Sequence, residues 1–348
     1  MARIVVIGSY NRDLVWYVCG FPVGGQTVEG RFSSAHGGKG SNQAIACAKA
    51  AGGAGGAKRV TFVAAVGDDA FGDEAVGFYG GLGADARIAR VAGVPTGNAG
   101  IFVAESGENV IVISEGANGA LRPALVPGLR ETLEDPGTGL VIMQCELPFS
   151  NTLEFVALIS EAKGRNPALR FVFNPAPYRG DFDYARILPH VDIFCPNETE
   201  AAGIAGVPAT ADVDVACCLA VVDKLAGAVK SAGSGQGPAF VVFTLGSRGC
   251  RVVDVATREH RDVPSHRAGP VVDTTGAGDC FLGCLAVRLS ELLAGGKEGA
   301  PSALTLERLV AAADFASVAA GISVTRPGAA PSSPAREEVE AALAARAQ

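Results

Sequence analysis

Short apolar runs that alternate with helical stretches are the feature that most restricts the fold of this chain. In its second half these runs are Leu140–Gln144, Arg170–Asn174, Ile193–Cys195 and Phe240–Thr244. A chain that alternates strands and helices builds a parallel sheet, because each crossover helix returns the chain to the starting edge of the next strand. The sequence therefore predicts an α/β fold with a doubly wound, mostly parallel sheet flanked by helices.

Further elements extend this pattern in both directions along the chain. Strands are expected at Ile4–Ile7 and Val60–Val66, and helices at Ser41–Ala51, Phe71–Leu82, Gly276–Leu293 and Leu306–Gly321. A hairpin is expected at Arg251–Val255 and Arg261–Val263, and glycine-rich surface loops at Gly52–Lys58 and Ser231–Pro238. Because single α/β domains of 348 residues are common, and because we find no internal repeat, we expect a single domain over residues 1–348.

Four extended segments do not fit the parallel core. They are Leu14–Val18, Thr27–Phe32, Ala99–Ala104 and Asn109–Ile113, and Thr27–Phe32 has the mixed polar and apolar character of an exposed strand. The last two surround Ser106-Gly107, which is typical of a hairpin. We expect these segments, within residues 14–32 and 99–113, to form a small antiparallel sheet that serves as a lid.

Charge and cysteine content narrow the class of protein. The formal net charge of −7 argues against nucleic acids and anionic membranes as partners. The nine cysteines include no C-x-x-C pair, so we expect most of them to be small core residues of a protein in the reducing cytosol. The apolar run before Gly8 is too short for a signal peptide or a membrane span, which also favours a cytoplasmic location.

The strongest chemical signal is the segment Asp273-Thr-Thr-Gly-Ala-Gly-Asp279. The start of a helix leaves backbone N–H groups unpaired, and those of Gly276–Gly278 would form an anion hole reinforced by the helix dipole. Asp279, in the first helical turn, would then be placed to act as a general base. A helix that is only capped by threonine and glycine, with an acidic first turn, is the structural alternative.

A second signal is His36-Gly-Gly-Lys-Gly-Ser-Asn-Gln43. Its glycines allow a ligand to approach the backbone, and Asn42 offers both a donor and an acceptor to a polyol. The segment lacks the spacing of a P-loop, and a plain turn into a helix is the alternative. Asn11-Arg-Asp13 follows the first strand, and ligands of open α/β sheets bind at the carboxyl ends of strands.

Polar residues also follow three of the later strands. These are Gln144-Cys-Glu146, Pro196-Asn-Glu-Thr-Glu200 and Thr244-Leu-Gly-Ser-Arg-Gly249. Each segment alone is more typical of a capped loop. Their shared position after an apolar strand makes them candidates for one common binding edge.

Together these segments resemble the ribokinase-like carbohydrate kinases, also called the PfkB family. Asp273–Asp279 is similar to the C-terminal signature of that family, and the resemblance extends from Gly8 to about Pro334. Asn11–Asp13, Gly37–Gln43 and Val324–Ser332 are similar to the ribokinase branch of the family. The resemblance implies a ribokinase-like doubly wound sheet with a small β lid, and a homodimer formed through that lid.

The resemblance also implies roles for individual residues. Asp279 would be the catalytic base, and Gly276, Ala277 and Gly278 would form the anion hole. The sugar hydroxyls would be held by Asn11, Asp13, Gly38, Lys39, Asn42 and Glu146, together with Asp279. The nucleotide would lie along Asn197, Thr244, Gly246, Ser247, Gly249, Gly278 and Ser317. Ser317 stands where ribokinases often carry an asparagine near the adenine.

Two kinds of metal ion are implied in the same way. Glu200, with Asn197, would organise Mg²⁺ through water near the phosphates. A monovalent cation such as K⁺ would lie beside the anion hole. Its ligands, mostly backbone oxygens, would come from Asp273, Thr275, Ser323, Arg326, Gly328 and Ser332.

The implied reaction is the ATP-dependent phosphorylation of D-ribose on its 5-hydroxyl group, which gives ribose 5-phosphate and ADP. The nearest alternative is another kinase of the family that acts on deoxyribose, a nucleoside or a hexose. A sugar-binding regulator without catalysis is less consistent with Asp279 and the Gly-Ala-Gly turn. An NAD-dependent enzyme is disfavoured, because Gly8-Ser-Tyr-Asn11 lacks the GxGxxG fingerprint.

Overall fold

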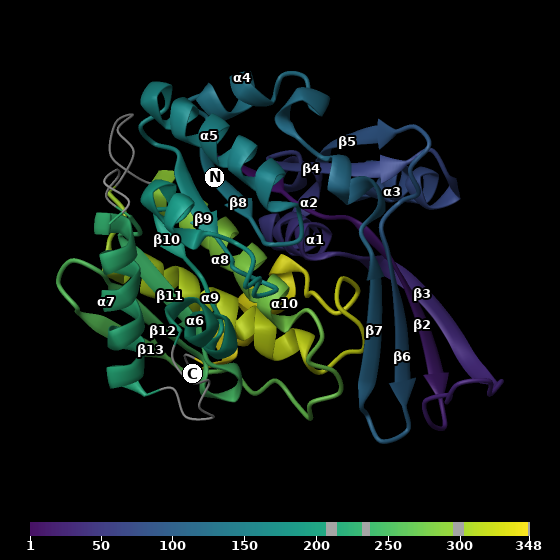
Figure 1. Cartoon of the computed structure of the whole chain (residues 1–348). Helices are drawn as coiled ribbons and strands as arrows, with labels where there is room; N and C mark the ends of the chain where they lie inside the picture. Colours follow the sequence, from purple (N-terminus) through teal and green to yellow (C-terminus); the bar gives the residue numbers. More distant parts are fainter. Residues whose placement is uncertain (207–213, 232–236, 295–302, 347–348) are drawn as a thin grey trace.

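The body of the protein is built on a large sheet that is parallel except at one edge (Figure 1). The computed structural model describes residues 1–206, 214–231, 237–294 and 303–346. Within these residues the main sheet has nine strands in the order β13-β12-β11-β10-β9-β8-β1-β4-β5. Its strands are β1 (Arg3–Ile7), β4 (Val60–Gly67), β5 (Asp85–Val91), β8 (Thr138–Met143), β9 (Arg170–Phe173), β10 (Ile193–Phe194), β11 (Phe240–Thr244), β12 (Cys250–Asp254) and β13 (His260–Val263).

The strand pairing confirms the predicted fold class. Every neighbouring pair from β5 to β11 is parallel. At the other edge β11 pairs antiparallel with β12, and β12 and β13 form the expected antiparallel hairpin. Successive residues of β1 point to opposite faces, so Ile4 and Val6 pack in one core and Val5 and Ile7 in the other. Because the sheet is covered on both sides, both faces of β1 are buried, and this explains why its residues Ile4–Ile7 are all apolar.

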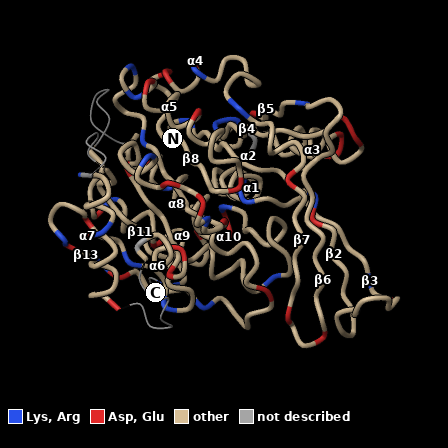
Figure 2. Tube along the Cα trace, in the orientation of Figure 1, with Lys and Arg blue, Asp and Glu red and all other residues tan. Residues whose placement is uncertain are grey.

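Helices cover the two faces of the main sheet. Buried residues of four helices pack with Ile4 and Val6, and these helices are α1 (Lys39–Ala51), α3 (Ala70–Leu82), α8 (Ala277–Ala294) and α9 (Leu306–Ser323), with α10 (Arg336–Arg346) beside them. The helices that pack with Val5 and Ile7 are α4 (Leu129–Glu134), α5 (Phe149–Arg165), α6 (Glu198–Ala205) and α7 (Val215–Ser231). No helix within the described residues is long and apolar enough to cross a membrane. Basic and acidic residues are interspersed along the chain (Figure 2).

A second sheet projects from one side of the body (Figure 1). It contains four strands in the order β3-β2-β6-β7, and these are β2 (Asn11–Val18), β3 (Gly30–Gly37), β6 (Asn98–Ala104) and β7 (Asn109–Ser114). The separate sheet and its β6–β7 hairpin agree with the expectation from the sequence. The sheet is not purely antiparallel, however, because β2 and β6 run parallel.

Some expected boundaries were wrong. The strand expected at Thr27–Phe32 is β3, which starts at Gly30 and continues to Gly37, because it pairs with β2 along the full length of that strand. The segment Gly52–Lys58 is not an open loop, since it contains the short helix α2 (Gly53–Ala57). Most of the loop expected at Ser231–Pro238 lies outside the described residues. Strand β5 and helix α10 had not been expected from the sequence.

Candidate active site

The turn that leads into α8 has the shape predicted for an anion hole, with one exception. Gly276 has a φ of 73°, and a Cβ atom there would lie 2.6 Å from the Cβ of Ala329, so only glycine fits. No backbone carbonyl of the described residues accepts a hydrogen bond from the N–H groups of Gly276, Gly278 or Asp279. Ala277 differs, because its N–H already donates to the carbonyl of Thr274 at 3.2 Å. The turn therefore offers several free donors beside Asp279.

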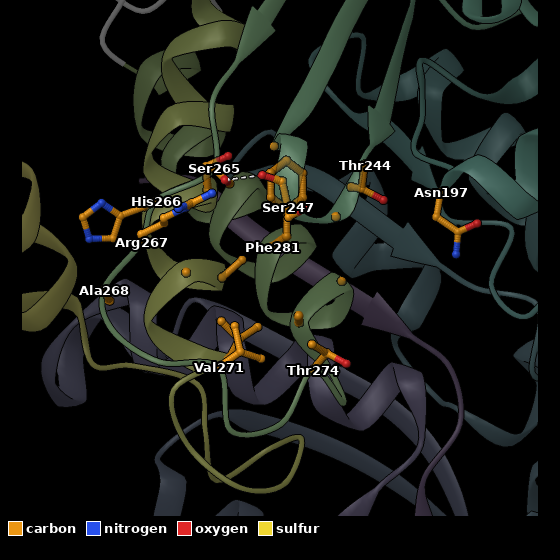
Figure 3. A pocket seen from close by; sticks show the side chains of 18 of the residues that line it. Asn197, Thr244, Ser247, Ser265, His266, Arg267, Ala268, Val271, Thr274 and Phe281 are labelled. Carbon is orange, nitrogen blue, oxygen red and sulfur yellow. Dashed lines mark hydrogen bonds between the residues drawn. The ribbon is translucent and has the colours of Figure 1, made fainter. Parts of the chain in front are cut away.

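A cavity of about 700 Å³ opens next to this turn (Figure 3). All seven residues expected along the nucleotide line it: Asn197, Thr244, Gly246, Ser247, Gly249, Gly278 and Ser317. The sequence had not indicated the segment Ser265–Gly269, which forms another wall of the cavity. Ser265 anchors this segment by donating from its hydroxyl to the carbonyl of Ser247 at 2.6 Å. Gly321 is required beside it, since a Cβ there would lie 2.1 Å from the carbonyl oxygen of His266.

Asp279 lies in a buried group of side-chain amides. Its Oδ2 accepts a hydrogen bond from Asn42 Nδ2 at 3.1 Å, and its Oδ1 accepts one from Gln43 Nε2 at 2.9 Å. Asp279 and Asn42 are only 7% and 8% exposed. The helices α1 and α8 approach closely here because position 283 is glycine, where a Cβ would lie 2.7 Å from the carbonyl oxygen of Gln43. Helix packing thus brings together residues 237 positions apart in the sequence.

The start of α1 is held against the ends of β1 and β8. Glu146 Oε2 accepts hydrogen bonds from the backbone N–H of Lys39, at 2.8 Å, and from the hydroxyl of Ser9. The N–H of Gly40 donates to the same hydroxyl at 3.3 Å. Gly38 has a φ of 87°, and a Cβ there would lie 2.9 Å from the N of Asn11. These contacts place the expected sugar residues from three separate segments at one edge of the sheet.

Asp13, in β2, interacts electrostatically with the acids Glu146 and Asp279. Its carboxylate lies against Gly37, where a Cβ atom would be 2.1 Å from Oδ2, so a larger residue at position 37 would displace it. Burial, with the negative charge of Glu146 as the next cause, raises the pKa of Asp13 to about 7, although Arg12 opposes the shift. The carboxyl group of Asp13 therefore changes its protonation state near neutral pH.

Lys39 is a cation that interacts electrostatically with three acids of this region. Burial opposes the charging of its ammonium group, but the carboxylates of Asp279, Glu146 and Glu200 outweigh burial and raise its pKa. The side chain therefore stays charged between the predicted sugar residues and the predicted magnesium residue. Together with Arg12, which acts on Asp13, this lysine partly neutralises the negative charge of the site.

Asn11 has a structural partner that the sequence did not reveal. Its Oδ1 accepts a hydrogen bond from Asn118 Nδ2 at 2.8 Å, and Asn118 also bonds both the N–H and the carbonyl of Tyr10. A Cβ at Gly97, the residue before β6, would lie 2.5 Å from Asn11 Oδ1, so the backbone that leads into β6 passes directly beside this pair. Asn118 thereby fixes the beginning of β2, from which Asp13 projects.

Asn197 and Glu200 form the N-terminal cap of α6. Asn197 Oδ1 accepts from the N–H of Glu200 at 2.8 Å, while Glu200 accepts from the N–H and the Nδ2 of Asn197 at 2.9 and 3.0 Å. Burial is the main reason that the pKa of Glu200 is raised, and the charges of Lys39 and Asp279 act on it in opposite directions. Carboxylate oxygens accept several bonds each, so this pair also fits a magnesium ion bound through water.

The loop after α9 is tied to the anion-hole turn and to α1. Asp273 accepts hydrogen bonds from the N–H of Thr275 at 2.9 Å and of Gly328 at 2.8 Å. The ammonium of Lys49 donates to three carbonyls of the same loop, those of Ala330, Pro331 and Ser333, at 3.3, 3.2 and 2.8 Å. Sequence reasoning had not identified Lys49, because nothing in a helix pattern indicates which loop its side chain reaches.

The predicted cation ligands are grouped around this loop. In the part of the chain that the structure describes, no backbone N–H donates to the carbonyls of Thr275, Arg326 or Gly328. The carbonyl of Ser323 already accepts from the N–H of Arg326 at 3.0 Å, and the hydroxyl of Ser332 donates to Ala329 at 2.7 Å. Free carbonyl oxygens beside a carboxylate fit a large monovalent cation. Among the described residues, no group of three or more histidine, cysteine or acidic side chains could hold another metal.

A family model described as the pfkB family of carbohydrate kinases matches residues 1–336 of this sequence. The chain belongs to this family. The ribokinase of Schizosaccharomyces pombe is 35% identical over 352 aligned residues, which cover 98% of this chain and 97% of the relative.

Solved structures agree with this assignment. The structure of a ribokinase from Giardia lamblia is 53% identical, with a TM-score of 0.91 and 99% coverage of both chains. The Arabidopsis thaliana ribokinase, solved in complex with ribose and ATP, is 27% identical, with a TM-score of 0.78 and 98% coverage of both chains. The whole chain, including the projecting sheet, therefore has the architecture of these carbohydrate kinases.

Proposed function

We propose that this protein transfers the terminal phosphoryl group of ATP to the 5-hydroxyl group of D-ribose, giving ribose 5-phosphate and ADP. The observation that carries the proposal is that two adjacent residues, Gly278 and Asp279, face two different parts of the site. Gly278 lines the large cavity, whereas Asp279, the next residue, lies in the buried group of amides and acids. A nucleotide in the cavity and a sugar beside Asn42 would therefore meet at the start of α8. The similarity to ribokinases supports ribose as the sugar.

Asp279 is proposed as the general base. Its carboxylate is held from one side by Asn42 and Gln43, and it would accept the proton of the sugar hydroxyl as the phosphoryl group is transferred. The free N–H groups of the α8 turn would stabilise negative charge on the phosphoryl oxygens. Asn42, Asp13, Lys39 and Glu146 would orient the sugar, with Asn11 and Gly38 shaping the backbone beside them.

Metal ions are part of this proposal. Glu200 and Asn197 would hold hydrated Mg²⁺, which would neutralise phosphate charge when bound. K⁺ would be bound by Asp273 and by the carbonyls of Thr275, Ser323, Arg326 and Gly328, with Ser332 beside them. The free carbonyls described above and the link from Asp273 to Gly328 support this second site.

We further propose that the four-stranded sheet is a lid and that two copies of the chain pair through it. Trp16 lies between Phe32 and Phe102, with ring centroids 5.2 and 5.3 Å apart, and the strand pairing continues this row to Val110. Phe32 and Val110 are 53% and 45% exposed. Such an apolar row on one face of a projecting sheet is typical of an interaction surface. The buried free cysteines of the body fit a location in the reducing cytoplasm.

A panel of sugars tests the function directly. The purified chain is incubated with ATP and Mg²⁺, and ADP release is measured with D-ribose, 2-deoxy-D-ribose, D-fructose, D-glucose and adenosine. We expect the highest kcat/KM with D-ribose and a product whose phosphate is attached to C5 in ³¹P–¹H NMR spectra. If another acceptor gives a higher kcat/KM than D-ribose, that acceptor would be assigned as the substrate in place of ribose. No ADP release with any of them would contradict kinase activity itself.

A further inference from the structure

We propose that Gln43 is a positioning residue that orients Asp279 and holds it in its ionised form. The inference rests on the proposed function, because it assumes that Asp279 is the base. Gln43 is fully buried in α1, next to the predicted sugar residue Asn42, and it had no role in the sequence-based interpretation.

Gln43 uses all of its side-chain hydrogen-bonding groups except one acceptor lone pair. Its Nε2 donates to Asp279 Oδ1 at 2.9 Å and to Asn174 Oδ1 at 3.1 Å. Its Oε1 accepts a hydrogen bond from Gln144 Nε2 at 2.6 Å. Asn174 in turn donates from Nδ2 to the backbone carbonyl of Cys195 at 2.8 Å. One buried glutamine thus connects the ends of three strands with the start of α8.

The directions of the Asn174 and Gln43 amides in this chain of bonds are determined by the partners on either side of each. The carbonyl of Cys195 can only accept, so Asn174 must turn its NH₂ toward Cys195 and its oxygen toward Gln43. An ionised Asp279 can also only accept, so Gln43 must present its NH₂ to both neighbours. Its oxygen then faces Gln144, which supplies the matching donor. Rotation of the Gln43 amide by 180° would break all three contacts.

This arrangement favours the form of Asp279 that a general base requires. Both hydrogen bonds to the carboxylate, from Gln43 and Asn42, come from N–H donors. Donors stabilise a carboxylate more than a carboxylic acid. Asn42 is expected to bind sugar, so its amide must serve two partners, whereas Gln43 is fully buried and serves Asp279 without contacting solvent. Gln43 is therefore the contact that persists through the reaction cycle.

The test compares two substitutions that keep the length of the side chain. Gln43→Met removes the amide, and Gln43→Glu keeps an oxygen toward Gln144 but replaces the NH₂ group with a second acceptor. We expect Gln43→Met to lower kcat roughly 10- to 100-fold, as for the loss of a hydrogen bond to a charged group, with KM for ATP nearly unchanged. The acidic limb of the kcat–pH profile should move to higher pH, and further in Gln43→Glu, because a carboxylate loses an N–H donor in both variants.

Other charged groups near Asp279 stay in place in both variants. Lys39, Asp13 and Glu200 interact electrostatically with Asp279, and none of them is altered. The matched control is Asn166→Ala, which removes a buried amide with three backbone hydrogen bonds, to Leu133, Asp135 and Thr138. It should lower the melting temperature at least as much as Gln43→Met and leave kcat and the pH profile unchanged.

The outcomes separate this inference from the proposed function. A Gln43→Met variant with normal kcat and an unmoved pH profile overturns the role of Gln43. The role is also overturned if Asn166→Ala shows the same loss of kcat at the same loss of melting temperature. If Asp279→Asn retains full turnover, the assignment of the base fails and the inference fails with it. Should Gln43→Met not fold, Gln144→Leu, which removes only the donor that orients Gln43, should shift the pH profile in the same direction.

Discussion

Asp273 and Gly328 are joined by a hydrogen bond of 2.8 Å from the N–H of the glycine to Oδ2 of the carboxylate, across 55 residues of sequence. The other oxygen of Asp273 accepts from the N–H of Thr275, so one carboxylate connects the turn before α8 with the loop after α9. Burial opposes ionisation of Asp273, but the side chain of Thr275 and the two N–H donors outweigh burial and lower the pKa of Asp273, which therefore stays ionised. The anion-hole turn depends on this contact for its shape.

Substitution of Asp273 by alanine should abolish activation by K⁺. Among the proposed cation ligands, only Asp273 has a negatively charged side chain. Its carboxylate also accepts a hydrogen bond from Gly328, in the loop that supplies several of the carbonyl ligands. Rates are measured in KCl, NaCl and tetramethylammonium chloride at matched ionic strength, with saturating Mg²⁺. Equal rates of the unmodified protein in all three salts would rule out the cation site.

Lys49 should stabilise the same loop from the opposite side. Lys49→Met removes three hydrogen bonds to the carbonyls of Ala330, Pro331 and Ser333, and we expect the free energy of unfolding to fall by roughly 1–3 kcal/mol. The measurement is urea denaturation followed by circular dichroism. Lys58→Met, at an exposed position beyond α1, is the control and should be neutral. Equal stability of the two variants would show that the loop does not need Lys49.

Replacement of Asp279 by asparagine should lower kcat by about 10²- to 10⁴-fold, the range for loss of a general base. The binding of ATP should change little, because Asp279 does not line the nucleotide cavity. Isothermal titration with ATP and steady-state assays with ribose separate the two effects. Near-normal turnover of the variant would assign the proton to another group.

Asp13 should make stability depend on pH. Its pKa in the folded protein is raised to about 7, mainly by burial, so the folded state binds the proton more tightly than the unfolded chain does. The contribution of Asp13 to stability is therefore complete below its unfolded value near 4 and is lost as the pH rises toward 7. Asp13→Asn should flatten the fall in melting temperature between pH 4 and about 7. An unchanged slope in the variant would contradict this assignment.

Glu200→Gln should raise the Mg²⁺ concentration needed for half-maximal activity. Glutamine is compatible with the capping box that α6 forms with Asn197, so the fold should be retained while the negative charge is lost. A Mg²⁺ titration at saturating ATP and ribose measures the change. A superimposable titration curve would remove Glu200 from the surroundings of the metal.

Local patterns predicted most of the body of the fold. The apolar runs at β1, β4, β8, β9 and β11 identified the strands, because a strand buried on both faces has few polar residues. Edge strands were harder to predict. β5 carries Asp85, Arg87 and Arg90 within seven residues, so its composition does not indicate a strand until its pairing with β4 is known.

Neighbouring residues in one motif were also predictable as a group, because a helix start presents its free N–H groups whatever lies around it. Asp279 was predicted in this way, whereas Asn42 was predicted from the donor and acceptor of its side-chain amide in a separate glycine-rich segment. Their contact was not, since it depends on how closely α1 packs against α8 at Gly283.

By itself, then, the sequence determined the α/β class, the start of α8 with its candidate base, and the polar ends of the strands. Only the tertiary structure decided that Gln43 joins Asn42 in donating to Asp279, that Lys49 reaches the loop after α9, and that Asp13 shares its surroundings with Glu146. The physical reason is that strand and helix formation follow from residues close in the chain. Hydrogen bonds and charge interactions between distant residues depend on distances that packing alone sets.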